Sequence, residues 1–570
     1  MDKIEFLYPV NNTFRHSVCL DGSWFFAFDE IGRGKWENGI PRKRTVPVPA
    51  AIQDLCLDVT EKQWCGDLWY EKTIFVPKEW LGEDVFLRFD GIGRKGTVFI
   101  NGIELGRHEG TYTEFILDIT KHVRYGEDNR LVVCVNTVAT LSDLIAGTIK
   151  ELPNGRKVNI HTPLMTTVRQ SYLANTDGIP MVGRDTPHGL VGSVHMYSLP
   201  QNRILSAVAK TIAISDEKAE VEYMVQVQGN CLVTATMRDQ DGRVVATSVG
   251  GNAILTIENP TCWQIGMPYL YTIDFEVSRL GKQHDMYTFP IGLRQVEMEN
   301  GRFLLNGSEV TLKGVRLELH QDFYSDADYI KVKRQMLQIL AVGGNVIFAG
   351  GYTLSNEVLQ IADETGILVV AELPVTELSS TNKNFASSVQ DRYIDSLEHL
   401  VQRQYLYTSL VAWNVLTVPQ ILAGKDEEYI SKLIEQARKL DWQHRPILLT
   451  TFQNASEIPE TIPTMVDMLI LNHWLYTENL EVDEVADGIY QDLINWNARY
   501  PNLPIILALG DTRNYLNYSL PMAQVGESEN WLSTLLGVIT PMPNVKGIYL
   551  YQANHVSPAV IKMYWEDKKL

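Results

Sequence analysis

Short apolar strands alternate with amphipathic helices over residues 293–570, and this alternation constrains the fold more than any other feature. The helical pattern YIKVKRQMLQILAVGG precedes the apolar run NVIFAGG, and NEVLQIADETG precedes ILVVAELP. Buried strands separated by helices over such a length are typical of a (β/α)8 TIM barrel. In that fold the chemistry lies at the carboxyl ends of the strands, so candidate site residues are expected there.

The first half of the chain has a different pattern. Residues 1–200 contain short strands such as WYEKTIFV and RLVVCVNT, with alternating apolar and polar positions and turns rich in Gly, Asn and Asp. This pattern predicts a β-sandwich. Residues 201–292 add AEVEYMVQVQG and LYTIDFEVSRLG, each about the length of an immunoglobulin-like strand. The sequence therefore predicts a multidomain protein: a β-sandwich (1–200), an immunoglobulin-like β-sandwich (201–292) and a TIM barrel (293–570).

Composition and charge narrow the range of partners. The net charge of −19 over 570 residues repels phosphate backbones, so we expect no nucleic-acid partner. No run approaches the roughly 18 apolar residues of a membrane span, and the first residues have no apolar signal-peptide core. We therefore expect a cytoplasmic protein without a membrane partner.

Known metal and cofactor motifs are missing. The sequence contains no HExxH, no DxDxDG and no Cys/His cluster with ligand spacing. It also contains no GxGxxG and no GxxxxGK[ST], the loops that bind nucleotides. We expect neither a metal nor a cofactor.

The segment from Trp64 to Thr137 carries a family resemblance. The runs WCGDLWYEKTIFVPKEW and VFLRFDGIGRKGTVFINGIELGRHEGTYTEFILDIT resemble the sugar-binding sandwich of family 2 glycoside hydrolases of the β-glucuronidase and β-galactosidase kind. In the barrel, ADETG and VAELP resemble the third-strand region of that family. The resemblance implies a jelly-roll-like sugar-binding domain, a carbohydrate ligand, a role in carbohydrate metabolism and a homo-oligomer.

Family 2 enzymes hydrolyse glycosides with two glutamates, and neither has a counterpart at the matching position. The region from Arg403 to Trp413 matches the family without a gap, which puts the family's Asn-Glu pair at Thr417 and Val418, with Val418 at the acid/base position. The run PIILA matches the strand before the nucleophile, which puts Leu509 at that position. Valine and leucine can neither transfer a proton nor attack a sugar. The resemblance predicts that Val418 and Leu509 face each other across the barrel mouth.

Displaced acids are an alternative source of catalysis. Strand alternation would point Asp511 to the same face as residue 509, although a loop or capping role is the simpler interpretation. The other displaced candidates are Glu372, at the end of the third strand, and Glu318, beyond the first; Glu372 could equally serve as a structural hydrogen-bonding residue at the rim.

Other residues expected near the mouth are candidates for substrate binding. Among them, a tryptophan in a strand is more often a core residue than a sugar platform, and a loop histidine is as often simply solvated. Where the family has an arginine and a histidine on the second strand, this chain has Phe348 and Gly351. The substrate-binding candidates are His320, Tyr352, Trp413, Asn414, Asn472, His473, Trp474 and Tyr551.

Two main hypotheses follow, and the sequence leaves enzymatic activity open. The first is a non-hydrolytic, carbohydrate-binding member of the family, because both catalytic glutamates are replaced. The alternative is an active β-glycosidase that uses displaced acids or a group on the substrate. A purely structural role is a third hypothesis.

Overall fold

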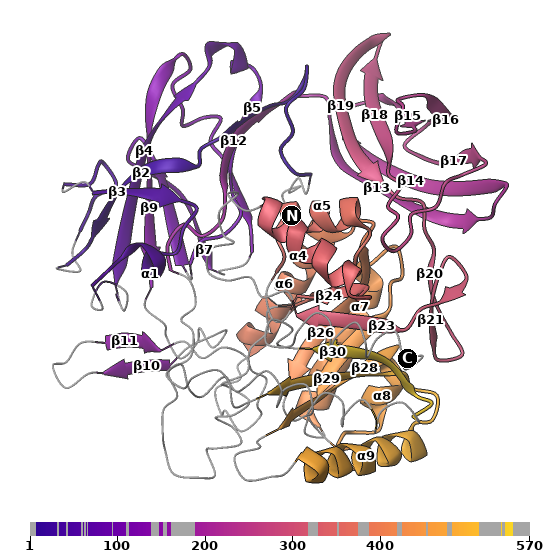
Figure 1. The fold of residues 1–570 in the computed structure, drawn as a ribbon. Coiled ribbons are helices and arrows are strands. Elements are labelled where there is room, and N and C mark those ends of the chain that lie inside the picture. The colour runs from indigo at the N-terminus through magenta and orange to yellow at the C-terminus, as the bar shows by residue number, and fades with distance from the viewer. Residues whose placement is uncertain are drawn as a thin grey trace.

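The computed structural model contains three regions along the chain, two sandwiches and a barrel (Figure 1). It describes residues 7–30, 34–41, 44–58, 61, 64, 66–93, 95–109, 113–137, 148–151, 157–160, 188–316, 329–349, 353–373, 387–418, 424–451, 454–475, 482–511, 537 and 542–550. The predicted fold class, two β-sandwiches followed by a TIM barrel, is confirmed. The exact domain boundaries stay a prediction.

The first sandwich packs a six-stranded sheet, β3-β2-β4-β9-β6-β7, against a four-stranded sheet, β1-β12-β5-β8. Its strands alternate buried and exposed positions, so one face of each sheet joins a shared core. At the β6–β7 hairpin, Asn101 and Gly102 have φ angles of 51° and 83°, as a two-residue turn requires. The elements are β1 (His16–Cys19), β2 (Gly22–Phe28), β3 (Arg44–Val48), α1 (Ile52–Leu55), β4 (Asp67–Val76), η1 (Lys78–Trp80), β5 (Asp84–Phe89), β6 (Lys95–Ile100), β7 (Ile103–Glu109), β8 (Phe115–Asp118), β9 (Glu127–Asn136), the paired β10 (Thr148–Glu151) and β11 (Lys157–Ile160), and β12 (Val194–Leu199).

The second sandwich packs sheet β13-β14-β17 against sheet β16-β15-β18-β19. Its core is formed by inward side chains of both sheets, with Tyr223 and Phe275 in contact 5.2 Å apart between ring centroids. The strands are β13 (Arg203–Ile214), β14 (Lys218–Gln228), β15 (Leu232–Arg238), β16 (Val244–Val249), β17 (Asn252–Glu258), β18 (Tyr271–Arg279) and β19 (Lys282–Ile291).

A small sheet, β20 (Val296–Glu299), β21 (Arg302–Leu305) and β22 (Ser308–Glu309), leads into a closed barrel of parallel strands. Pairing of the first barrel strand with the last closes the barrel. The barrel strands are β23 (Leu312–Arg316), β24 (Val346–Phe348), β25 (Leu368–Glu372), β26 (Leu410–Val418), β27 (Ile447–Thr451), β28 (Met468–Leu475), β29 (Ile505–Asp511) and β30 (Val545–Leu550). The described helices around them are α4 (Tyr329–Ala341), α5 (Asn356–Thr365), α6 (Ser387–Gln404), α7 (Lys425–Leu440), α8 (Thr461–Met465) and α9 (Val482–Arg499).

Local sequence explains where α5 begins and ends. The Ser355 side chain accepts a hydrogen bond from the Val358 amide at the N-terminus, which satisfies a free helix donor. Gly366 ends the helix in the left-handed conformation, with φ of 75°. The helix therefore stops at the point from which β25 can start.

Side chains of the barrel strands divide into two layers. Val369 and Leu507 belong to the core that the strands share with the helices, whereas their neighbours Val370 and Ala508 belong to the core inside the barrel. Because successive side chains of a strand point to opposite faces, the layer of a residue can be read from its position. These two layers fix which residues can reach the mouth of the barrel.

A chain of charged groups ties the first sandwich to the barrel. Arg403 of α6 donates to Glu114 at 3.2 Å, and Glu114 lies 3.9 Å from Arg88 of β5. Arg88 donates to Asp90 at 2.7 Å, and its guanidinium is almost fully buried. Residues of the sandwich are thus held against the outer layer of the barrel near α6 (Figure 1).

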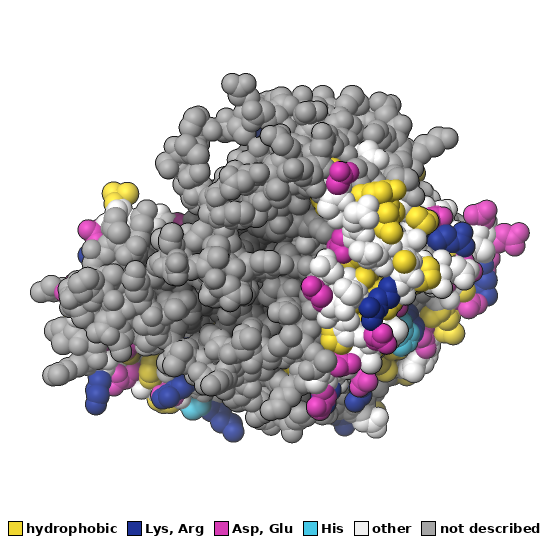
Figure 2. All heavy atoms as spheres, turned by 90° about the horizontal axis from the view of Figure 1, so that it is seen from below, with side chains coloured by type: hydrophobic (Ala, Val, Ile, Leu, Met, Phe, Trp, Pro, Cys, Tyr) yellow, Lys and Arg dark blue, Asp and Glu magenta, His cyan; other side chains and the backbone are white. Residues whose placement is uncertain are grey.

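Seen from below, the described part of the surface mixes hydrophobic, acidic and basic side chains (Figure 2). No helix in the described ranges combines the length and the hydropathy needed to cross a bilayer.

Candidate functional site

Four buried polar residues lie together at the carboxyl ends of three neighbouring barrel strands. Glu372 ends β25, Asn414 and Thr417 lie on β26, and Thr450 is the penultimate residue of β27. Their exposed fractions are 6%, 3%, 3% and 2%, respectively. We call Glu372, Asn414, Thr417 and Thr450 the mouth cluster.

Strand alternation places this cluster inside the barrel. Val370, Ala412 and Leu448 belong to the interior core, and each lies two residues before a member of the cluster, Glu372, Asn414 and Thr450 respectively. Residues two apart on a strand share a face. The mouth cluster is therefore the polar layer directly above the apolar filling of the barrel.

A bulge in β26 brings Thr417 into this layer. Residues three apart on a regular strand point to opposite faces, so Asn414 and Thr417 should diverge. The pairing of β26 with β27 shifts register between Asn414–Leu448 and Thr417–Thr450, which leaves one extra residue on β26. A bulge of this kind re-aims the side chains that follow it, and here Asn414 Nδ2 lies 3.4 Å from Thr417 Oγ1.

Hydrogen bonds join the four side chains in series. The Thr417 hydroxyl donates to Glu372 Oε1 at 2.5 Å. Asn414 Nδ2 donates to Thr450 Oγ1 at 2.9 Å and approaches Thr417 Oγ1 at 3.4 Å. Asn414 Oδ1, by contrast, is buried and has no hydrogen-bond partner in the described structure. The cluster thus presents a carboxyl group and an amide oxygen side by side.

The β24 and β30 side of the barrel interior is aromatic. Phe348 stacks on Tyr549, with ring centroids 4.1 Å apart, and both are buried. Gly314 of β23 leaves room for this pair, since a Cβ atom there would lie 2.3 Å from the Phe348 ring. Phe348 is therefore a core residue of the barrel interior.

The prediction that Leu509 faces Val418 across the mouth is wrong. Leu509 is 1% exposed and belongs to the core shared by strands and helices, together with Leu507. The pairing of β28 with β29 runs without a register shift up to Asp511, so no bulge turns residue 509 inward. An ungapped match to a family motif assumes a constant strand phase, and here the side chain at 509 points to the helices.

Trp413 is not a substrate-binding residue. Its indole is 1% exposed and packs in the outer core, and Nε1 donates to Asp441 Oδ2 at 3.0 Å. Alternation explains this position, because Trp413 precedes the inward-facing Asn414. The core interpretation of this tryptophan is therefore the correct one.

Among the remaining candidates, the structure describes the side chain of Asn472 alone. Asn472 lies on β28 and is 4% exposed, next to Ala508 of β29 in register. Val418, His473, Trp474 and Asp511 lie on described strands, but their side chains are outside the description. Glu318, His320, Tyr352 and Tyr551 lie outside the described residues. The roles proposed for all of these stay predictions.

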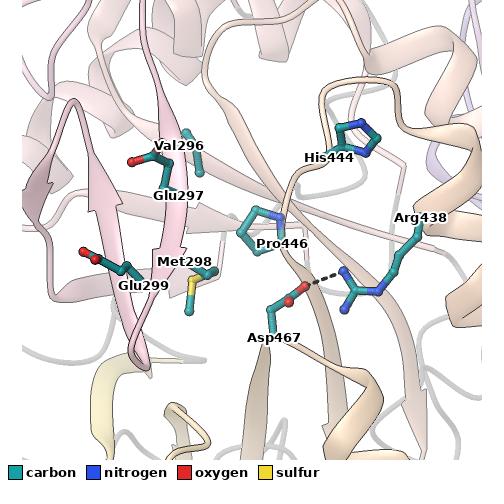
Figure 3. A pocket seen from close by; sticks show the side chains of 8 residues that line it. All are labelled: Val296, Glu297, Met298, Glu299, Arg438, His444, Pro446 and Asp467. Carbon is teal, nitrogen blue, oxygen red and sulfur yellow. Dashed lines mark ion pairs between the residues drawn. The ribbon is translucent and has the colours of Figure 1, made fainter. Parts of the chain in front are cut away.

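A pocket of about 530 Å³ lies at the opposite, N-terminal end of the barrel (Figure 3). It opens between β20 and the residues that lead into β27 and β28. Asp467 pairs there with Arg438 at 2.9 Å and accepts the Ile447 amide at 2.7 Å. These polar groups stabilise the start of β27, as expected because the N-terminal end of a TIM barrel contributes to stability.

Metal ligands do not gather in the described part of the chain. Within it, no three His, Cys, Asp or Glu side chains are placed to hold an ion.

Sequence reasoning missed Thr450 and the role of Thr417. Thr417 was identified only as the position matching the family asparagine, and Thr450 was not identified at all. A signal was present in the run ILLTT, where two polar residues end an otherwise apolar strand at the carboxyl end of a barrel.

Comparisons with known proteins agree with this architecture. Three models of glycosyl hydrolases family 2 match the chain: the sugar-binding domain at residues 18–143, the domain described simply as family 2 at 203–294, and the TIM barrel domain at 296–509. A β-glucuronidase of Streptococcus agalactiae is 24% identical over 521 residues, covering 88% of this chain and 83% of that protein.

Solved structures extend the likeness to the whole chain. A Ruminococcus gnavus β-glucuronidase superposes with a TM-score of 0.87 at 25% identity, covering 100% of both chains. The β-glucuronidase of that organism in complex with D-glucuronic acid gives a TM-score of 0.85 at 25% identity, covering 99% of this chain and 100% of that one. With its sandwich, immunoglobulin-like domain and barrel each matched in order, this chain belongs to glycosyl hydrolases family 2.

Proposed function

We propose that the protein is a β-glycosidase of the β-glucuronidase kind, with its sugar site at the mouth cluster and Glu372 as an acid of the reaction. The observation that carries this proposal is the buried Glu372 carboxyl, which accepts a hydrogen bond from Thr417 at the carboxyl ends of the barrel strands. Its relatives are named β-glucuronidases, and one of the similar structures holds D-glucuronic acid. We therefore take a β-linked uronic acid as the first substrate class to test.

The reaction sets a clear requirement on the site. A retaining glycosidase uses two carboxyl groups about 5 to 5.5 Å apart, one as nucleophile and one as acid/base. Glu372 supplies one carboxyl group in the barrel interior. The second would come from Asp511 or Glu318, or from a group on the substrate itself.

A second candidate function is sugar binding without hydrolysis. It is favoured by Val418, which the sequence match puts at the family's acid/base position, and by Leu509, whose side chain packs against the helical layer. A mouth with one carboxyl group can still bind a sugar by hydrogen bonds, while it lacks the covalent route.

One set of assays separates the two functions. Purified protein is incubated with nitrophenyl β-D-glucuronide and β-D-galactoside, and D-glucuronic acid binding is measured by calorimetry. Hydrolysis predicts turnover that falls about 10²- to 10⁴-fold in Glu372→Gln, the usual contribution of a general acid or base. The control is Glu428→Gln, which changes an exposed glutamate on α7.

The outcomes are distinct. Turnover by the wild type that is lost in Glu372→Gln, and that also falls in Asp511→Asn, supports catalysis by displaced acids. Binding of D-glucuronic acid with no turnover above the Glu372→Gln variant supports the second function. If the wild type neither binds nor cleaves these sugars, both are wrong. The homo-oligomer and the cytoplasmic location stay predictions, and light scattering tests the first of them.

A further inference from the structure

The hydrogen bonds of the mouth cluster have a direction that can be assigned. A threonine hydroxyl has one hydrogen, and that of Thr417 is donated to Glu372 Oε1. Thr417 therefore turns a lone pair toward Asn414, and the atom of Asn414 that faces it must be the Nδ2 donor. With Glu372 Oε1 as the acceptor of the Thr417 hydroxyl, the amide orientation of Asn414 follows from these contacts.

This orientation leaves an acceptor without a donor. Asn414 Nδ2 uses its hydrogens toward Thr450 and Thr417, and Asn414 Oδ1 is buried without a partner in the described structure. Buried polar atoms are almost always hydrogen-bonded, so an exception within a candidate site points to a missing donor. Sugar hydroxyl groups are donors of the right size and chemistry.

The surroundings suit a sugar hydroxyl group. The free oxygen belongs to a residue that is 3% exposed, inside a barrel whose layer below is apolar. Glu372 lies on the neighbouring strand, paired in register with Asn414, so the unpartnered oxygen of Asn414 lies beside the carboxyl-bearing strand end of the proposed sugar site.

We propose that Asn414 is a specificity-determining residue whose Oδ1 accepts a hydrogen bond from a sugar hydroxyl group, and that Thr417 is a positioning residue that holds Glu372 as an acceptor. The inference rests on the proposed sugar site at the mouth cluster. It assigns the work to two side chains that β26 brings together only through its bulge.

The test uses the full-length protein and D-glucuronic acid as the probe in titration calorimetry. Asn414→Leu removes the acceptor at similar volume, and the affinity is expected to fall about 10-fold, as for the loss of one good hydrogen bond. Methyl β-D-glucuronide is the second probe. Its monodeoxy analogues identify the hydroxyl group, because the analogue lacking it should bind wild type and Asn414→Leu equally.

Thr417 is tested with a matched pair of variants. Thr417→Ser keeps the hydroxyl donor and should retain wild-type binding. Thr417→Val removes it, so Glu372 loses the hydrogen bond that holds its carboxyl group. The affinity for D-glucuronic acid should therefore fall in Thr417→Val alone, and Thr417→Ser serves as the conservative rescue.

Distinct results overturn the inference. If every variant is folded by circular dichroism and Asn414→Leu binds within twofold of wild type, Asn414 Oδ1 contacts no sugar hydroxyl. If Thr417→Ser and Thr417→Val bind D-glucuronic acid equally well, Thr417 does not position Glu372. If Asn414→Leu does not fold, Asn414→Ser replaces it under the same criterion. Absence of sugar binding by the wild type refutes the proposed function and this inference with it.

Discussion

The two ends of the barrel each bury a carboxyl group, and they hold it differently. At the N-terminal end, Asp363 is 1% exposed and accepts the backbone amides of Thr408 and Ser409 at 3.1 and 2.6 Å. At the carboxyl end, Glu372 accepts the side-chain hydroxyl of Thr417. Backbone amides at the start of β26 hold Asp363, whereas a side chain that follows the bulge of β26 holds Glu372.

A second acid strengthens this contrast at the N-terminal end. Asp441 accepts from Trp413 Nε1, from the Arg445 amide and from the Arg445 guanidinium, all within 3.0 Å. Both side chains of the ion pair are 1% exposed. These contacts of Asp441 join parts of the scaffold, which indicates that they stabilise the fold, whereas the sugar site is proposed at the mouth cluster.

The largest expected effect comes from placing an acid in the wrong layer. Leu509→Glu puts a carboxyl group into the core between strands and helices, where it loses the leucine packing and has to be buried. We expect the free energy of unfolding to fall by about 4 kcal/mol or more. Urea unfolding followed by circular dichroism measures this.

The control for this change is Leu509→Met, which should destabilise by less than about 1.5 kcal/mol. Stable Leu509→Glu protein would mean that the side chain turns to the mouth, against its packing with Leu507.

Asp441→Ala should follow in size. It leaves the Arg445 guanidinium buried without its carboxylate, and breaking such a pair destabilises by about 3 to 5 kcal/mol. The measurement is again urea unfolding, with activity or sugar binding of the folded fraction as a second readout. Unchanged stability would remove the contrast between the two ends.

Asp363, at the N-terminal end of the barrel, should make the stability of the protein depend on pH. Burial raises the pKa of this carboxyl group from 3.8 to about 6, while hydrogen bonds from Ser409 and Thr408 lower it. The folded protein therefore holds this proton more tightly than the unfolded chain. The contribution of Asp363 to the free energy of unfolding is greatest in acid and is lost as pH rises from about 4 to 6. A difference of this size corresponds to roughly 3 kcal/mol.

The measurement compares urea unfolding of wild type and Asp363→Asn at pH 4 and pH 7. The difference in stability between the two proteins should change with pH in the direction given above. An equal difference at both pH values would show that Asp363 does not titrate in this range.

The smallest stability effect is expected at the mouth. Glu372→Gln keeps an oxygen for the Thr417 hydroxyl and should change the free energy of unfolding by less than about 1 kcal/mol. The same variant should have the largest effect on sugar chemistry, and thermal unfolding beside the sugar assays checks both. A strongly destabilised Glu372→Gln protein would assign Glu372 to the scaffold.

The sequence predicted the fold because its signals are periodic. In the strands of both sandwiches and in helices such as α4, apolar residues recur on the side that is buried. This recurrence can be read directly along the sequence. The position of Glu372 at the end of β25 followed from the same rule about barrel strands.

The site was predicted less well, because it depends on which residues of β26 and β29 point into the barrel. The bulge in β26 has no turn residue to announce it, since Val415 and Leu416 read as ordinary strand. The inward turn of Thr417 could not be read from spacing, and neither could the outward packing of Leu509. Trp413 was placed on its face correctly only by the general preference of tryptophan for cores.

The bulge in β26 also separates two parts of the strand whose residues are constrained in different ways. Before it, Leu410 to Trp413 are constrained by volume, since each fills a defined space in one of the two layers. After it, Thr417 is constrained by the group it holds. Deletion of either Val415 or Leu416 would restore regular alternation and leave Thr417 two residues after Asn414, on the same inward face. Loss of the bulge at the present length would instead turn Thr417 away from Glu372. The length of β26 and its bulge must therefore change together if the contact between Thr417 and Glu372 is to persist.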